Sequence, residues 1–242
     1  MKKIKKQLSV AEYFDRRAPT YGSWFKQSLG NRTVDNLEKE AVLRLLMPPS
    51  GKKKLTILEI GVGRGRIARY LLNNLPIESY MGVDISRRMI RTLKKEKIKG
   101  LKLIWYKGER LPLKRRMDSV ISIRQIKYNQ NLANQLLLMK KNLIKNGILI
   151  IEFPSCYSVS GIRNLFIKSS GVLVDPFRLK KAVKELGFTA IIMEPLRYLP
   201  DNVYALTNGK TMLTVVLILE KWLRKILPYW LAKSILLKAR LS

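Results

Sequence analysis

The sequence of 242 residues contains no histidine, one cysteine and only 17 acidic residues. The absence of histidine removes the commonest general base and the commonest metal ligand. With Cys156 as the sole cysteine, a disulfide framework and a cysteine-based zinc site are excluded, and we expect no bound metal. A lone cysteine fits a reducing, intracellular setting, so we expect a cytoplasmic protein.

Long apolar runs are also missing. The longest, residues 212–219, is interrupted by Glu220 and Lys221 and is much shorter than the roughly 20 residues that a spanning helix needs. The basic residues 2–6 are not followed by an apolar segment, so we expect no secretory signal.

Positive charge is abundant instead. Lysine and arginine number 48, which gives a formal net charge of +31. Such an excess favours nucleic acid, anionic lipid headgroups or acidic small molecules as partners. Alternatively, lysine simply fills exposed positions, because the basic residues are spread along the whole chain. A hydrophobic content of 47% is enough for a folded core and excludes a disordered chain.

Short apolar runs alternate with helical patterns through most of the chain. Such alternation predicts an α/β protein with a mainly parallel sheet and helices on both faces. The helices are predicted at 67–75, 86–97, 132–144 and 175–187, with Ser86 and Asp175 as N-caps. The strands are predicted at 55–60, 80–84, 101–106, 119–123, 148–153, 188–193 and about 234–239.

Amphipathic helices are predicted at both ends. Residues 1–46 have apolar residues at helical spacing, and the segment ends at Pro48 and Pro49. Residues 212–227 have one apolar face, with Lys221, Arg224 and Lys225 on the other. This second helix could lie in a membrane interface, or it could pack on the sheet or cover a pocket.

The sharpest motif is Gly61-Val-Gly-Arg-Gly65, between the first strand and the first helix of the sheet. Ligands of open α/β sheets bind at such a turn, and glycine lets the backbone approach them closely. A dinucleotide fingerprint would need glycine where Arg66 stands, and no Walker A sequence follows.

Asp84 is the second signal, because it ends the second strand 19 residues after Gly65. A carboxylate at this position can accept hydrogen bonds from both ribose hydroxyls of a nucleoside. Together with the glycine turn, it predicts a nucleoside-containing ligand.

These motifs, with residues 109–112 and 117–120, resemble class I S-adenosylmethionine-dependent methyltransferases, most closely the small-molecule and lipid methyltransferases that include those of quinone biosynthesis. Residues 13–21 resemble the lid of that subgroup. The resemblance extends over residues 10–195 and is specific for fold and cofactor. It implies a Rossmann-like seven-stranded sheet, a helical lid at 1–50, and a cofactor-binding domain at 51–242 with a C-terminal helical insertion at about 196–232.

The resemblance also implies cofactor contacts. Glu59 would lie near the amino group, and Asp84 would hold the ribose hydroxyls. The remaining contacts would come from Gly61, Gly63 and Gly65 beneath the methionine and ribose, Ile85 and Gly108 at the adenine, and Ser122 and Ile123 at the methionine end.

Two positions depart from the family pattern. Lys107 stands where an acidic residue often binds the adenine amino group, so that contact is missing or comes from Glu109. The segment Gln125-Ile-Lys-Tyr128 lacks the histidine of many relatives, which removes one possible base. Tyr13, Tyr21 and Tyr128 are the candidate catalytic residues by position.

The expected function is therefore in-line methyl transfer from S-adenosylmethionine to a small-molecule or lipid-like acceptor. The alternatives are an RNA methyltransferase that uses the basic surface and a non-catalytic adaptor for membranes or nucleic acid. Peripheral contact with an anionic membrane is a further expected interaction.

Overall fold

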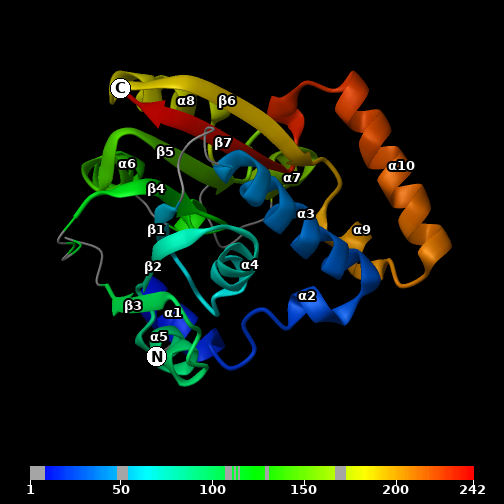
Figure 1. Cartoon of the computed structure of the whole chain (residues 1–242). Coiled ribbons are helices and arrows are strands. Elements are labelled where there is room, and N and C mark those ends of the chain that lie inside the picture. The colour runs from blue at the N-terminus through cyan, green and yellow to red at the C-terminus, as the bar shows by residue number, and fades with distance from the viewer. Residues whose placement is uncertain are drawn as a thin grey trace, which may run out of the picture.

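The computed structural model describes residues 9–47, 54–106, 111, 113, 115–128, 131–166 and 173–242. One seven-stranded sheet, in the order β3-β2-β1-β4-β5-β7-β6, forms its centre (Figure 1). The strands β1 to β5 are mutually parallel, and β7 is antiparallel to both β5 and β6. The bounds of the strands are β1 Leu55–Ile60, β2 Ile77–Asp84, β3 Leu101–Trp105, β4 Met117–Ser122, β5 Leu143–Phe153, β6 Phe188–Arg197 and β7 Ser234–Leu241.

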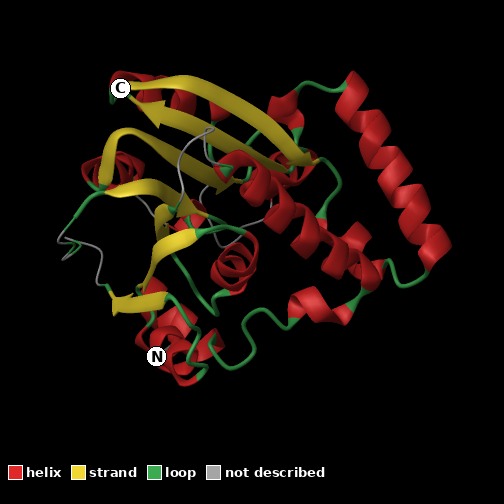
Figure 2. Ribbon diagram, viewed as in Figure 1, coloured by secondary structure: helices red, strands yellow, loops and turns green. Residues whose placement is uncertain are grey.

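Helices cover both faces of the sheet (Figure 2). Alternate strand residues point to opposite faces, so Leu58 belongs to one core cluster and Ile57 to the other. The first cluster includes side chains from α6 Leu132–Lys141 and α8 Pro176–Glu185. The second includes side chains from α3 Leu29–Leu46, α4 Arg66–Asn74 and α5 Arg87–Lys95. The predicted α/β sheet with helices on both faces is confirmed.

Ser86 and Asp175 are N-caps, as predicted. The Ser86 hydroxyl accepts a hydrogen bond from the Met89 N–H, and the Asp175 carboxylate accepts from the N–H groups of Phe177 and Arg178. These bonds satisfy amide groups that the helix itself leaves unpaired.

The predicted helix at 132–144 is too long, and the predicted start of the fifth strand is too late. Helix α6 ends at Lys141, and β5 begins at Leu143, which is fully buried and pairs with Met117. The apolar spacing of Leu136, Met139 and Leu143 suits a helix, but the last of these belongs to the sheet. An irregular pairing follows at Asn146, whose φ is 62°.

The N-terminal segment, expected as a lid over residues 1–50, divides into parts with different packing. Helix α3 buries Val42, Leu45 and Leu46 in the core of the sheet. The short helices α1 Val10–Arg17 and α2 Trp24–Gln27 bury no residue completely. A lid role is therefore a proposal for α1 and α2 alone.

Between β6 and β7 lie α9 Asp201–Leu206, α10 Lys210–Ile226 and the short helix η2 Tyr229–Leu231. The short helix α7 Val159–Phe166 was not predicted, and α9 lies within the helical insertion expected at about 196–232. Helix α10 lies outside α3 and α9, at the outer edge of the molecule (Figure 1). No helix within the described ranges is long and apolar enough to cross a membrane.

Candidate functional site

The glycine turn after β1 has a left-handed backbone at three positions. The φ angles are 82° at Gly61, 52° at Gly63 and 69° at Gly65, values that residues with a Cβ adopt only with strain. A Cβ at Gly61 would lie 2.6 Å from Cγ of Gln125. The N–H groups of Gly61 and Val62 both donate to the carbonyl of Val83 in β2, which holds the turn against the neighbouring strand.

Asp84 joins this turn to the end of β2. Its Oδ2 accepts from the Gly63 N–H and its Oδ1 from the Ser86 N–H, each at 2.8 Å. Burial raises the pKa of the Asp84 carboxyl above its ordinary value, although these two bonds work in the opposite direction. The carboxylate is thus fixed in orientation at the carboxyl end of the sheet.

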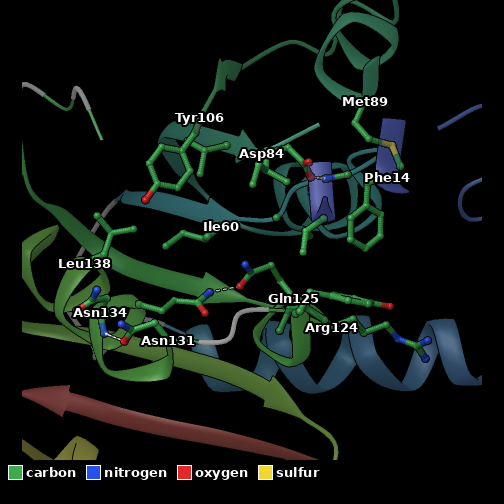
Figure 3. A pocket seen from close by; sticks show the side chains of 18 of the residues that line it. Phe14, Ile60, Asp84, Met89, Tyr106, Arg124, Gln125, Asn131, Asn134 and Leu138 are labelled. Carbon is green, nitrogen blue, oxygen red and sulfur yellow. Dashed lines mark hydrogen bonds between the residues drawn. The ribbon is translucent and has the colours of Figure 1, made fainter. Parts of the chain in front are cut away.

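A cavity of about 920 Å³ opens above this edge of the sheet. Asp84, Met89 and Tyr106 lie on one side of it, and Gln125 and Leu138 lie on the other (Figure 3). The cavity includes the predicted residues Gly61, Gly63, Asp84, Ile85, Ile123, Tyr21 and Tyr128, and also Val10, Phe14, Ile60, Val83, Met89, Tyr106, Arg124, Gln125, Asn131, Asn134, Gln135, Leu137, Leu138 and Lys141.

Comparisons with known proteins agree with this geometry. Residues 57–147 match the family model described as a methyltransferase domain. A malonyl-[acyl-carrier protein] O-methyltransferase from Priestia megaterium is 26% identical over 167 residues, which cover 64% of this chain and 57% of that relative. The aligned region thus amounts to little more than half of the relative's length. Residues 57–147 therefore match a methyltransferase domain, and the chain is similar to S-adenosylmethionine-dependent methyltransferases of class I.

Solved structures show the same methyltransferase fold. An S-adenosylmethionine-dependent methyltransferase from Thermotoga maritima superposes with a TM-score of 0.67 at 19% identity, over 96% of this chain and 99% of that one. A phosphoethanolamine N-methyltransferase from Haemonchus contortus, solved with S-adenosylhomocysteine, gives 0.67 at 16% identity, over 98% of this chain and 61% of that one. At these identities the likeness concerns the fold alone.

S-adenosylmethionine is the cofactor of this methyltransferase family, and the described site suits it. Backbone N–H groups use about two of the four lone-pair positions of the Asp84 carboxylate, so the other positions can accept from a ligand. The buried Gln135 Oε1 on the cavity wall has no hydrogen-bond partner, so it offers an acceptor to a bound polar group. A side chain at Gly61 would run into Gln125, so glycine keeps the approach to the backbone clear. Within the described ranges, no group of acidic and cysteine residues could hold a metal.

A polar chain crosses the cavity wall at the end of β4. The Ser122 hydroxyl donates to Oε1 of Gln125 at 3.0 Å, and the Gln135 amide donates to the same oxygen. This chain fixes Gln125 above the glycine turn, where its side chain is seen in Figure 3. Ser122 itself does not line the cavity and acts on it through Gln125.

Arg124 is held by a charge network behind the cavity. Its Nε donates to Glu38 at 2.7 Å, its backbone N–H donates to Glu152 at 2.8 Å, and Arg66 donates to Glu38 at 2.6 Å. Burial alone would raise the pKa of Glu38, but the two guanidinium groups outweigh it and lower that pKa to about 2. In Figure 3 the Arg124 side chain extends away from the cavity centre toward α3.

Aromatic side chains close one end of the cavity. Phe14 of α1 makes edge-to-face contacts with Tyr21 and with Tyr128, at 5.9 and 4.8 Å between ring centroids. Burial raises the pKa of Tyr21 to about 12 and also raises the pKa of Tyr128. Tyr13 does not line the cavity, and its hydroxyl accepts a hydrogen bond from Arg17.

A hydrogen-bonded contact ties α1 to α5. The Oδ1 atom of Asp15 accepts from the Ser86 hydroxyl at 2.6 Å and from the Arg88 N–H at 2.9 Å. A carboxylate at the start of a helix is favourable because the helix dipole is positive there. Phe14 is therefore placed over the cavity by its neighbour Asp15.

Some predicted contacts lie elsewhere. Glu59 does not line the cavity, because it points to the face of β1 opposite to that of its neighbour Ile60. There its side chain accepts a hydrogen bond from the Tyr80 hydroxyl at 2.7 Å. Gly65 also lies off the cavity, and a Cβ there would meet Leu93 at 2.9 Å. Gly108 and Glu109, like Lys107, fall outside the described residues.

Several cavity residues were missed in the sequence. Gln135 lies inside a predicted helix, where glutamine carries no site signal. Asn131 could have been noticed as a cap, because its side chain accepts from the Asn134 N–H. Phe14 was within the lid motif, and Gln125 was noted only as a departure from the family.

Proposed function

We propose that the protein transfers a methyl group from S-adenosylmethionine to a small-molecule or lipid-like acceptor. One observation carries the proposal: the glycine turn and the fixed Asp84 carboxylate line a single cavity at the carboxyl end of the sheet. The cavity is large enough for the cofactor together with part of an acceptor.

The ribose would be held by Asp84, with Ile85 and Met89 as apolar neighbours for the base. The methionine end would lie toward Gly61 and Gln125. The unpartnered Gln135 Oε1 would accept a hydrogen bond from the cofactor ammonium or from the acceptor. This placement keeps Gly61, Gly63, Asp84, Ile85 and Ile123 as cofactor contacts and leaves Glu59 and Ser122 as supports behind them.

Bound S-adenosylmethionine supplies a methyl group already activated by the positive sulfur. The protein then needs mainly to orient the acceptor in line with that group and to exclude water. Tyr21, with a pKa of about 12, and Tyr128 stay protonated at neutral pH, so we assign them orientation and hydrogen-bond donation rather than proton removal. An acceptor that is already ionised would need no base.

Charge around the cavity favours such an acceptor. Lys141 lies on the cavity wall, whereas the charge of Arg124 is paired with Glu38, and the chain as a whole carries +31. The names of two relatives, a malonyl-carrier-protein O-methyltransferase and a phosphoethanolamine N-methyltransferase, suggest the first acceptors to test.

The test is transfer of a tritiated methyl group from S-adenosylmethionine to malonyl-acyl carrier protein, phosphoethanolamine, quinol precursors and transcribed RNA in parallel. Label in a small molecule or carrier-bound acyl group supports the proposal. Label in RNA alone would establish the RNA methyltransferase instead. Cofactor binding without labelling of any acceptor, including those in a total cell extract, would favour the adaptor.

A further inference from the structure

The outer face of α10 is a continuous apolar stripe. Val215, Ile218, Trp222 and Ile226 are each 58–63% exposed, although all four side chains are large and hydrophobic. Their spacing of three, four and four residues places them along one side of the helix. Together with the exposed Met212 and Leu219, they form the surface that we call the α10 stripe.

The orientation of the stripe is fixed from the opposite side of the helix. Val216 is buried against Val34 and Tyr204. Glu220 is also buried, and its carboxylate accepts from the N–H groups of Tyr198 and Leu199 and from the Tyr204 hydroxyl at 2.6 Å. Because these contacts anchor α10 to α3, α9 and the end of β6, the helix cannot simply rotate to hide the stripe.

Positive charge borders the stripe on one side. On a helical projection, Lys210, Lys221 and Lys225 lie together beside the apolar residues, and all three are exposed. The only acidic residue of α10 is Glu220, which is buried and engaged, so no carboxylate of the helix reaches the outer face. An apolar strip flanked by lysine is the pattern of a helix that lies in the plane of an anionic membrane surface.

We propose that the α10 stripe docks the protein onto an anionic lipid bilayer, with Trp222 and its apolar neighbours in the headgroup–acyl boundary and the three lysines at the anionic headgroups. A second copy of the chain fits less well, because an antiparallel two-fold pairing of this face would bring like-charged lysine rows together. None of the cavity-lining residues is in α10, so the proposal is independent of methyl transfer.

The test is co-sedimentation of the full chain with vesicles of phosphatidylcholine alone or with about 30 mol% phosphatidylglycerol. We expect binding to the anionic vesicles to be at least about tenfold stronger, and to weaken with added salt. Trp222 fluorescence, taken as the difference between the wild type and Trp222→Phe, should shift to the blue and be quenched by brominated lipid.

The double variant Ile218→Ser, Trp222→Ser should lower vesicle partitioning at least about tenfold, and Lys221→Glu, Lys225→Glu should remove the preference for anionic lipid. Ile192→Ser is the matched control, because Ile192 is 51% exposed on β6, outside α10, and its variant should bind as the wild type does. Circular dichroism confirms that each variant is folded.

Four results would overturn the proposal. The first is equal, weak binding to both vesicle types. The second is wild-type partitioning by the folded Ile218→Ser, Trp222→Ser protein. The third is a wild-type dimer by light scattering that this variant converts to monomer. The fourth is RNA binding in place of lipid binding that only the lysine substitutions reduce.

Discussion

Asp84 Oδ2 accepts a 2.8 Å hydrogen bond from the backbone N–H of Gly63, across 21 residues of sequence. The end of β2 and the glycine turn after β1 therefore hold each other in place. The other carboxylate oxygen caps the Ser86 N–H, so that the turn, the carboxylate and the start of α5 form one unit. A ligand of this unit meets groups that are oriented before it arrives, which lowers the entropy cost of binding.

The glycine turn can be tested by comparing two glycines with similar φ. Gly61→Ala combines a φ of 82° with a Cβ 2.6 Å from Gln125, whereas Gly22→Ala has a φ of 86° and no atom within 4 Å. Backbone strain alone should cost about 1–2 kcal/mol in Gly22→Ala. Gly61→Ala should cost more and should also weaken cofactor binding, as measured by urea unfolding and calorimetry. Equal effects of the two substitutions would show that the contact with Gln125 is unimportant.

The tie between α1 and α5 should hold the aromatic end of the cavity closed. Asp15→Asn weakens the bonds from Ser86 and Arg88 and removes a charge at a helix N-terminus, an effect of about 0.3–1 kcal/mol. We expect faster hydrogen exchange in residues 9–17 and a cofactor Kd about threefold higher, since 0.6 kcal/mol is near RT. Glu40→Gln removes one exposed carboxylate from α3 and serves as the control. Unchanged exchange in Asp15→Asn would mean that α1 is held by its aromatic contacts instead.

The sequence was sufficient for the order of the strands and helices from β1 to β5, because apolar runs alternate with helical patterns and Ser86 is a clear cap of α5. It was insufficient at α6, where Leu143 fits the helical spacing yet belongs to β5. Helix α7 is short, and its apolar pattern is too brief to stand out.

The site residues also divide into those that the local sequence predicts and those that it does not. Gly61, Gly63 and Asp84 are set by local chain geometry, so their place at the cavity could be predicted. Glu59 is one residue before the strand end, and strand alternation directs it to the opposite face, toward Tyr80. The Glu38 contacts join α3 to residues 28 and 86 positions away, and no local pattern in the sequence predicts such pairings.

Glu59 should make stability depend on pH in an unusual direction. Burial raises its pKa to about 8, and the Tyr80 hydroxyl bond only partly opposes this. The folded state therefore retains a proton that the unfolded chain has lost above about pH 4.5, so stability falls as pH rises from about 5 to 8, by up to about 1.4 kcal/mol per pH unit. Glu59→Gln stays neutral and should become more stable than the wild type as pH increases. Urea unfolding at several pH values would refute this if the difference between the two proteins stayed constant.

Glu38 should make stability depend on pH in the opposite direction, so that stability falls as pH is lowered. Its folded-state pKa of about 2 lies below the ordinary value of 4.5, so its contribution is complete above about pH 4.5 and is lost as pH falls toward 2. Glu38→Gln leaves Arg66 and Arg124 without their carboxylate and should lower the free energy of unfolding by about 3–5 kcal/mol at pH 7. The exposed Glu185→Gln on α8 is the control and should change little. A loss below 1 kcal/mol in Glu38→Gln would indicate that the network is not needed for stability.

Calorimetric titration of S-adenosylmethionine into the wild type, Asp84→Ala and Glu78→Gln tests the central claim most directly. Glu78 lies on the same strand as Asp84 but is exposed at its far end, so its variant should bind as the wild type does. Asp84→Ala removes two charge-assisted hydrogen bonds of about 1.5–3 kcal/mol each and should raise the Kd at least about a hundredfold. Asp84→Asn keeps one acceptor oxygen, so its Kd should lie between those of the wild type and Asp84→Ala. No binding by the wild type, or equal affinity in the wild type and a folded Asp84→Ala protein, would contradict the assignment of this cavity to S-adenosylmethionine.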